Sequence, residues 1–135
     1  MKNKDLDLGD VTIKFRDDGI VNLHFRGEHT IEANAVEKVL DTLQEEYPKM
    51  KCHLLITGDK GFNMSQEARA FASSDKYDAI SCADAIVQVD YSHQMAANFF
   101  IRFSKPNRPV KIFPDEERAV TWLLTQIAGN GEAEE

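Results

Sequence analysis

The spacing of apolar residues predicts a β-hairpin near the start of the chain. Residues 11–16 and 20–25 alternate apolar and polar side chains, which is typical of strands with one buried face. Asp17, Asp18 and Gly19 lie between these two segments, and an Asp-Gly pair is common in tight hairpin turns. We therefore expect an antiparallel pair of strands joined by this turn.

The rest of the chain alternates helical and strand patterns. Apolar residues recur at helical spacing from Ile31 to Tyr47, with Thr30 as the expected N-cap and Pro48 as the stop. The other expected elements are helices over residues 65–73, 92–103 and 115–128, and strands over residues 52–57, 83–89 and 110–113. The resulting order is ββαβαβαβα.

This order predicts the fold class. Strands that are joined through helices pair in parallel by right-handed crossovers, and the helices pack on the sheet. We therefore expect an α/β fold with a mixed five-stranded sheet and four helices. The chain should form a single domain over residues 1–135, with frayed ends at residues 1–9 and 129–135. The pattern leaves the order of the strands in the sheet open.

Composition and charge exclude several classes of protein. Of 135 residues, 42% are apolar and 29% are charged, which is ordinary for a globular domain. The net charge of -7 argues against nucleic-acid binding, because phosphates would be repelled. No apolar run reaches the ~18 residues of a spanning helix, so an integral membrane protein is not expected. The first residues lack an apolar signal region, and we expect a cytoplasmic protein.

The cysteines and histidines do not form a recognisable reactive site. Cys52 and Cys82 fall in or beside predicted strands, and buried free thiols are the expected state of both. Burial raises the pKa of a thiol and suppresses its reactivity. The four histidines are scattered without ligand spacing. We therefore expect no metal, no cofactor and no enzymatic activity.

Four segments carry a resemblance to a known family. They read DDGIVNLHF, MSQEARAFASS, ANFFIRFSKPNRPVKIF and DEERAVTWL, and they span most of the chain from Val11 onward. In their order and spacing the chain resembles the small bacterial STAS/Sec14-like proteins, in an uncharacterised branch of the SpoIIAA-like relatives of anti-sigma-factor antagonists. The resemblance implies a non-enzymatic module. Better-known relatives are phosphoserine switches that bind a kinase, or carriers of apolar ligands.

Ser65 stands where the antagonists have their regulated serine, at the start of the helix after the third strand. The antagonist motif has an Asp followed by small hydroxyl residues and glycine, whereas this chain has Asn63-Met64-Ser65-Gln66-Glu67. A phosphate on Ser65 would be stabilised by the helix N-terminus and opposed by Glu67. The alternative is a plain N-cap, worth ~1 kcal/mol. We favour the N-cap and keep phosphorylation as an alternative.

The helix expected over residues 92–103 is more apolar than a sheet-packed helix requires. Its apolar positions cover about 240° of the helix circumference, although a stripe of ~100° or somewhat more is sufficient. The surplus face could contact a neighbouring helix, a second copy of the chain or an apolar ligand. The residues predicted for an interface or an apolar-ligand surface are Met95, Ala96, Phe99, Phe100, Ile101 and Phe103.

A basic stretch overlaps the end of this helix. No acidic residue occurs between Tyr91 and Pro114. The predicted anion-binding residues in this stretch are Arg102, Lys105 and Arg108. The alternative is a solvated rim that binds nothing, or one that pairs with the acidic residues at 115–117.

We therefore expect a regulatory or protein-interaction module that self-associates into a homodimer through the 92–103 helix. The first alternative is a carrier or sensor of a small apolar or amphipathic anion, such as a lipid-like ligand. In that case the phenylalanines of this helix would line a pocket with the basic residues at its mouth. The second alternative is a phosphoserine switch at Ser65.

Overall fold

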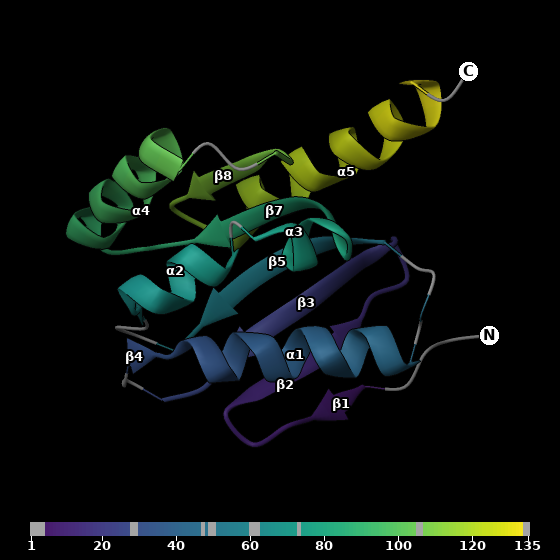
Figure 1. The fold of residues 1–135 in the computed structure, drawn as a ribbon. Coiled ribbons are helices and arrows are strands. Elements are labelled where there is room, and N and C mark those ends of the chain that lie inside the picture. The colour runs from purple at the N-terminus through teal and green to yellow at the C-terminus, as the bar shows by residue number, and fades with distance from the viewer. Residues whose placement is uncertain are drawn as a thin grey trace.

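A six-stranded mixed sheet lies at the centre of the molecule (Figure 1). The computed structural model describes residues 5–27, 30–46, 48, 51–59, 63–72, 74–104 and 107–133, with the backbone alone at 99–100, 103–104 and 130–133. The strands, in spatial order, are β1 (Leu6–Asp7), β2 (Val11–Phe15), β3 (Ile20–Phe25), β5 (Cys52–Gly58), β7 (Ser81–Val87) and β8 (Val110–Phe113). The first three strands pair antiparallel and the other neighbours pair in parallel. The predicted α/β fold is confirmed.

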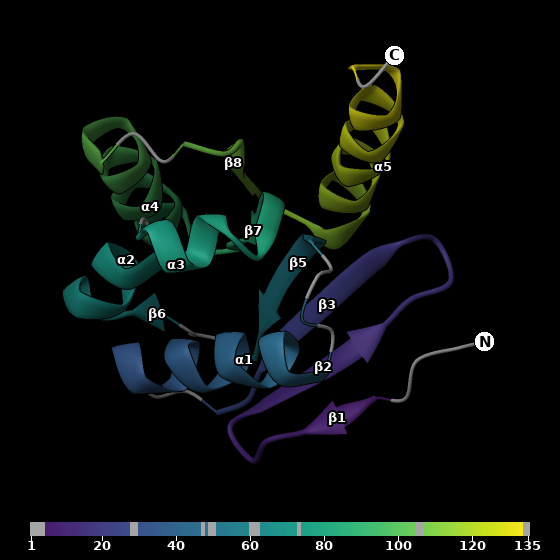
Figure 2. The same ribbon diagram turned by 45° about the vertical axis from the view of Figure 1, so that its right-hand side comes forward.

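Helices cover the two faces of the sheet unequally (Figure 2). The helices are α1 (Ala33–Glu46), α2 (Gln66–Ala72), α3 (Asp75–Asp78), α4 (Tyr91–Ser104) and α5 (Glu116–Ala133). One face carries α1, α2 and α3, and α4 follows on the same side, next to β8. The opposite face carries α5, which packs on β5, β7 and β8.

Each face of the sheet has its own apolar core. The larger core lies under α1, α2 and α3 and includes Leu54 and Ile56 of β5. The smaller core lies under α5 and includes Leu55 of the same strand. Successive side chains of a strand point to opposite faces, so this near-continuous apolar strand supplies both cores.

The predicted hairpin is present, with its turn at the expected residues. Ile13 pairs with Leu23 and Phe15 with Val21 across the two antiparallel strands. Gly19 has a φ of 90°, a left-handed conformation that glycine adopts without strain. The Asp-Gly pair therefore predicts this turn because its glycine can adopt the positive φ that the turn requires.

The start of α1 differs from the prediction. Thr30 and Ile31 form β4 (Thr30–Ile31), which pairs in parallel with β6 (Asn63–Met64). Thr30 therefore belongs to a strand and does not cap α1, which begins at Ala33. Tyr47, the expected last apolar position of this helix, lies outside the described residues.

The two ends of the domain have more regular structure than expected. Leu6–Asp7 pairs with β2, in a segment that was expected to fray, and α5 continues to Ala133 rather than ending at residue 128. The segment after α2, which has no clear period, forms the short helix α3 capped by Ser74. These differences add an edge strand and a short helix to the predicted fold and leave its topology unchanged.

Candidate functional site

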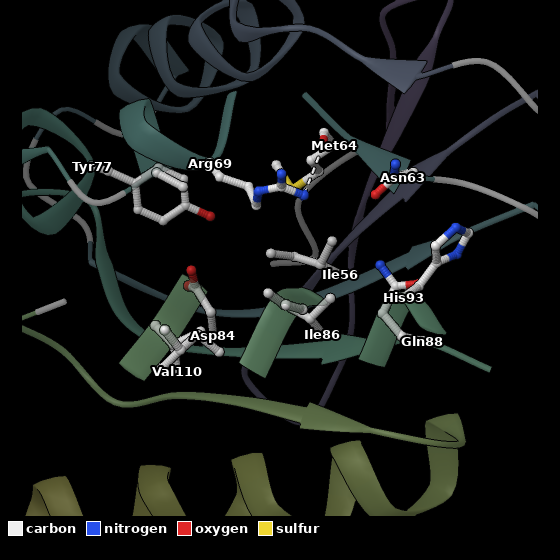
Figure 3. A pocket seen from close by; sticks show the side chains of 13 residues that line it. Ile56, Asn63, Met64, Arg69, Tyr77, Asp84, Ile86, Gln88, His93 and Val110 are labelled. Carbon is white, nitrogen blue, oxygen red and sulfur yellow. Dashed lines mark hydrogen bonds between the residues drawn. The ribbon is translucent and has the colours of Figure 1, made fainter. Parts of the chain in front are cut away.

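A pocket opens between α4, the α2–α3 segment and the sheet (Figure 3). The cavity has a volume of about 50 Å³, and it is partly open to solvent. The sheet supplies Ile56, Asp84, Ile86, Gln88 and Val110. The remaining lining residues are Asn63, Met64, Arg69, Ala72, Tyr77, His93, Ala97 and Ile101.

The periods of the strand and the helix explain which side chains meet in this pocket. Asp84, Ile86 and Gln88 are two residues apart and therefore project from the same side of the chain. His93, Ala97 and Ile101 are four residues apart and share one face of α4. The wall between these two sets is mainly apolar.

One end of the pocket is bounded by a buried ion-pair cluster centred on Arg108. Its Nη2 donates to Asp84 Oδ2 at 2.8 Å and to the Ala72 carbonyl oxygen at 2.6 Å, and its Nη1 donates to Asp78 Oδ1 at 2.6 Å. The guanidinium also lies 4.1 Å from the centre of the Tyr77 ring. Burial, followed by the charge of Asp84, raises the pKa of Tyr77 well above its usual value. We call Arg108, Asp84, Asp78 and Tyr77 the arginine cluster.

Arg108 therefore does not lie on an exposed basic rim, as the sequence had suggested. Its side chain is only 6% exposed and binds two carboxylates of the same chain. A carboxylate buried like Asp84 requires a charged partner, and Arg108, two residues before β8, supplies it next to the β7–β8 pair.

The other end of the pocket contains a buried glutamine, Gln88. Gln88 is 6% exposed and directs its amide into the pocket. Its backbone N–H donates to the Phe113 carbonyl oxygen at 2.9 Å, and its carbonyl oxygen accepts from Gln94 Nε2 at 2.6 Å. The side-chain amide of Gln88 makes no hydrogen bond within the part of the chain that the structure describes.

Asn63 and His93 lie at the same end as Gln88, opposite Tyr77 and Asp84 in the close-up view (Figure 3). We call Asn63, Gln88 and His93 the amide end of the pocket. Arg69 reaches into the space between the two ends, where its Nη1 donates to the Met64 carbonyl oxygen at 3.0 Å. The pocket thus combines an apolar wall with two amides, an imidazole, one guanidinium and the paired carboxylate of Asp84.

Helix α4 turns only part of its predicted apolar surface toward the pocket. Ile101 lines the pocket, whereas Met95 is 56% exposed and Ala96 is exposed. Arg102 is also exposed. The side chains of Phe99, Phe100 and Phe103, and the whole of Lys105, lie outside what the structure describes. Of the residues predicted for an apolar surface, the structure brings Ile101 to the site.

Ser65 caps α2. Its Oγ accepts a hydrogen bond from the Ala68 backbone N–H at 3.0 Å, and its own backbone N–H donates to the Ile31 carbonyl oxygen at 2.9 Å. These are the contacts of a plain N-cap, the interpretation favoured from the sequence. Phosphorylation of Ser65 stays a prediction.

The polar residues of the pocket were missed from the sequence, although one signal was present. Asp84 and Gln88 interrupt an otherwise apolar strand and project from the same side of it. Polar groups in a buried parallel strand need hydrogen-bond partners, so their presence in such a strand indicates a structural or functional site. Asn63, Arg69 and His93 carry no comparable signal because they come from separate elements.

Comparison with known proteins places the chain in a family. Residues 13–127 match the model of a domain of unknown function (DUF7793). The chain belongs to this family. No curated protein matches it.

A solved structure supports the fold assignment. The chain is similar to an uncharacterised protein from the DUF3478 family with a SpoIIAA-like fold, from Shewanella loihica PV-4. The two share 17% sequence identity over 90% of this chain and 99% of that chain, with a TM-score of 0.56. This likeness confirms the SpoIIAA-like resemblance at the level of the fold.

The described residues contain neither a membrane-spanning helix nor a cluster of metal ligands. None of the helices there has the length and apolar character needed to cross a membrane. Within the same residues, no three potential ligands among histidine, cysteine and acidic side chains come together to hold a metal ion.

Proposed function

We propose that this domain is a non-enzymatic STAS-type module that binds a small amphipathic molecule in the pocket beside α4, as a carrier or sensor. The observation that carries the proposal is the buried amide of Gln88, which faces a mainly apolar pocket without a partner from the described chain. A buried amide left unpaired costs about 1–3 kcal/mol. A ligand with an apolar body and a polar group would offset this cost and fill the apolar wall.

The chemistry of the lining supports binding rather than catalysis. Asp84 already accepts hydrogen bonds from Arg108 and from Ser81 Oγ, which leaves it poorly placed to move a proton. Among the described residues, no serine or cysteine side chain is hydrogen-bonded to His93. Burial, and then the neighbouring Cys82, raise the pKa of Cys52 to about 11, so this thiol is a poor nucleophile at neutral pH.

Two adjacent alanines of α4 allow a matched test. Ala97 lines the pocket, whereas Ala96 is exposed and outside the lining. Native mass spectrometry of protein purified from its own host should detect a small molecule bound to the wild type. The Ala97→Trp variant should lose this mass because the indole fills the pocket, and Ala96→Trp should retain it. A wild type that never carries a small molecule, or an Ala97→Trp variant that carries it equally, would contradict the proposal.

Self-association through α4 is a second candidate function, favoured by the exposed apolar residues at its N-terminal half. Val89 is 81% exposed, Tyr91 72% and Met95 56%. These three residues are close together in the chain, and contiguous exposed apolar groups are common at protein interfaces. A homodimer predicts that Met95→Asp dissociates the protein in sedimentation velocity runs, while Asn98→Asp, on the same helix, does not. A wild type that is monomeric across a wide concentration range rejects this candidate.

A further inference from the structure

We propose that the amide end of the pocket binds the carboxylate of an aliphatic carboxylic acid, whose tail lies along the apolar wall. This inference rests on the proposed function and names the class of ligand and its orientation. The site consists of Gln88, Asn63 and His93, with Arg69 beside them.

The hydrogen-bonding capacity of the amide end suits a carboxylate. Gln88 and Asn63 each have an amide group with two N–H donors, and a neutral His93 has one ring N–H. A carboxylate accepts up to about four hydrogen bonds through its two oxygens. Gln88 is the central element, because it is more than nine-tenths buried and its amide has no partner in the described chain. A carboxylate next to it would satisfy this donor.

The balance of charges around the pocket favours a singly charged group. The lining contains one carboxylate, Asp84, and its charge is paired with Arg108 at 2.8 Å. The Arg69 guanidinium also faces the pocket, with its Nη1 bound to the Met64 carbonyl oxygen, and its positive charge favours an anion. A phosphate carries about -1.5 to -2 charges at neutral pH, more than one guanidinium matches. A carboxylate carries one charge and fits this environment better.

The arrangement of polar and apolar residues sets the direction of the ligand. Gln88 directly follows β7 and supplies a polar side chain at the amide end, and Ile86 of β7 precedes it by two residues in the lining. Ile101 lies two turns after His93 on the same face of α4. A tail that starts at the amide end therefore runs along Ile86, Ile101 and Val110 toward the arginine cluster. Asp90 caps the first turn of α4 through Ser92 and His93 and is outside the lining, so it has no role in this site.

Three probes with the same ten-carbon tail test which polar group the pocket prefers. Decanoate carries a carboxylate, 1-decanol a neutral hydroxyl group, and decyl phosphate a group of higher negative charge. Isothermal titration of the wild type should give the tightest binding for decanoate. The Gln88→Leu variant keeps a side chain of similar size without the amide, and Arg69→Met removes the charge. Each should weaken decanoate binding by about tenfold to a hundredfold, the loss expected for a hydrogen bond to a charged group. Binding of 1-decanol to Gln88→Leu should be unchanged or tighter.

Arg102→Met is the matched control, because Arg102 is an exposed cation on α4 outside the pocket lining. Its affinity for decanoate should stay within about twofold of the wild type. If 1-decanol or decyl phosphate binds as tightly as decanoate, or if Gln88→Leu and Arg69→Met bind decanoate normally, the carboxylate assignment is overturned while the binding pocket stands. If none of the three probes binds the wild type, the carboxylate assignment and the proposed function are both overturned.

Discussion

The two ends of the pocket differ in how many partners their buried polar side chains have. In the arginine cluster, Arg108 binds two carboxylates and a carbonyl oxygen through its Nη atoms, while its buried Nε has no hydrogen-bond partner among the described residues. At the amide end, the side chain of Gln88 is equally buried but has no partner in the described chain. Buried polar groups in folded proteins are nearly always hydrogen-bonded. The cluster, in which both Nη atoms of Arg108 are bound, therefore has the character of a structural element, whereas the amide end, where Gln88 faces the pocket without a partner in the described chain, has the character of a binding site.

Removing the cation of the arginine cluster should have the largest effect on stability. Arg108→Met leaves Asp84 buried without its charged partner, and breaking such a pair typically costs about 3–5 kcal/mol. Urea denaturation should show this loss in the free energy of unfolding. The exposed Arg102→Met serves as control and should change stability by less than about 0.5 kcal/mol. A loss below about 1 kcal/mol for Arg108→Met would mean that the cluster is not structural.

Removing the hydrogen bond that caps α2 should have an intermediate effect on stability. Ser65→Ala removes the acceptor of the Ala68 N–H and should cost about 1 kcal/mol in thermal or chemical unfolding. Ser65→Asp retains an acceptor at the same position and should keep most of this stability. If both variants are equally destabilised, the cap interpretation fails and another role of the hydroxyl must be sought.

Removing the amide of Gln88 should have a small effect of the opposite sign. Gln88→Leu replaces an unpaired buried amide by an apolar side chain of similar size, so the free energy of unfolding should be unchanged or rise by about 1 kcal/mol. The comparison between the two ends of the pocket would be contradicted if Gln88→Leu were as destabilising as Arg108→Met in the same urea titration.

The smallest effect on stability is expected for a row of hydrogen-bonded polar side chains on the face of the sheet opposite the pocket. His24 contacts Thr57 Oγ1 through Nδ1 at 2.8 Å and Asp59 Oδ1 through Nε2 at 3.0 Å. The Gly27 backbone N–H, and then His24, lower the pKa of Asp59. A carboxylate with a depressed folded-state pKa contributes stability above its unfolded pKa of ~3.9, and this stability is lost as the pH falls through the folded value. Asp59→Asn should therefore flatten the acid limb of the stability–pH curve, and an unchanged limb would contradict this assignment.

The fold was predictable from the sequence because its main elements are long and periodic. The hairpin, α1, β5 and the later strands each show a repeated apolar pattern over several residues. The elements that were missed are short: β1, β4 and β6 have two residues each, too few to show a period. Thr30 was taken as a cap because its pairing with Asn63 depends on a contact distant in sequence.

The pocket could be predicted only in fragments. The apolar excess of α4 was visible from the sequence, and Ile101 does line the site. The position of Arg108 was misjudged because its partner Asp84 becomes its neighbour only when β7 and β8 pair. Gln88 was not predicted, because the pocket beside α4 arises only from how the helices cover the sheet.

The most direct test of the account is whether the Gln88 amide acquires a partner. In a two-dimensional NMR spectrum, the side-chain N–H signals of Gln88 can be assigned by their absence from Gln88→Leu. Titration with decanoate should shift these signals in a saturable manner, because a carboxylate becomes hydrogen-bonded to the amide. The side-chain signals of Gln44, which is exposed on α1 away from the pocket, should stay in place. Gln88 signals that remain unchanged at saturating decanoate would contradict the account.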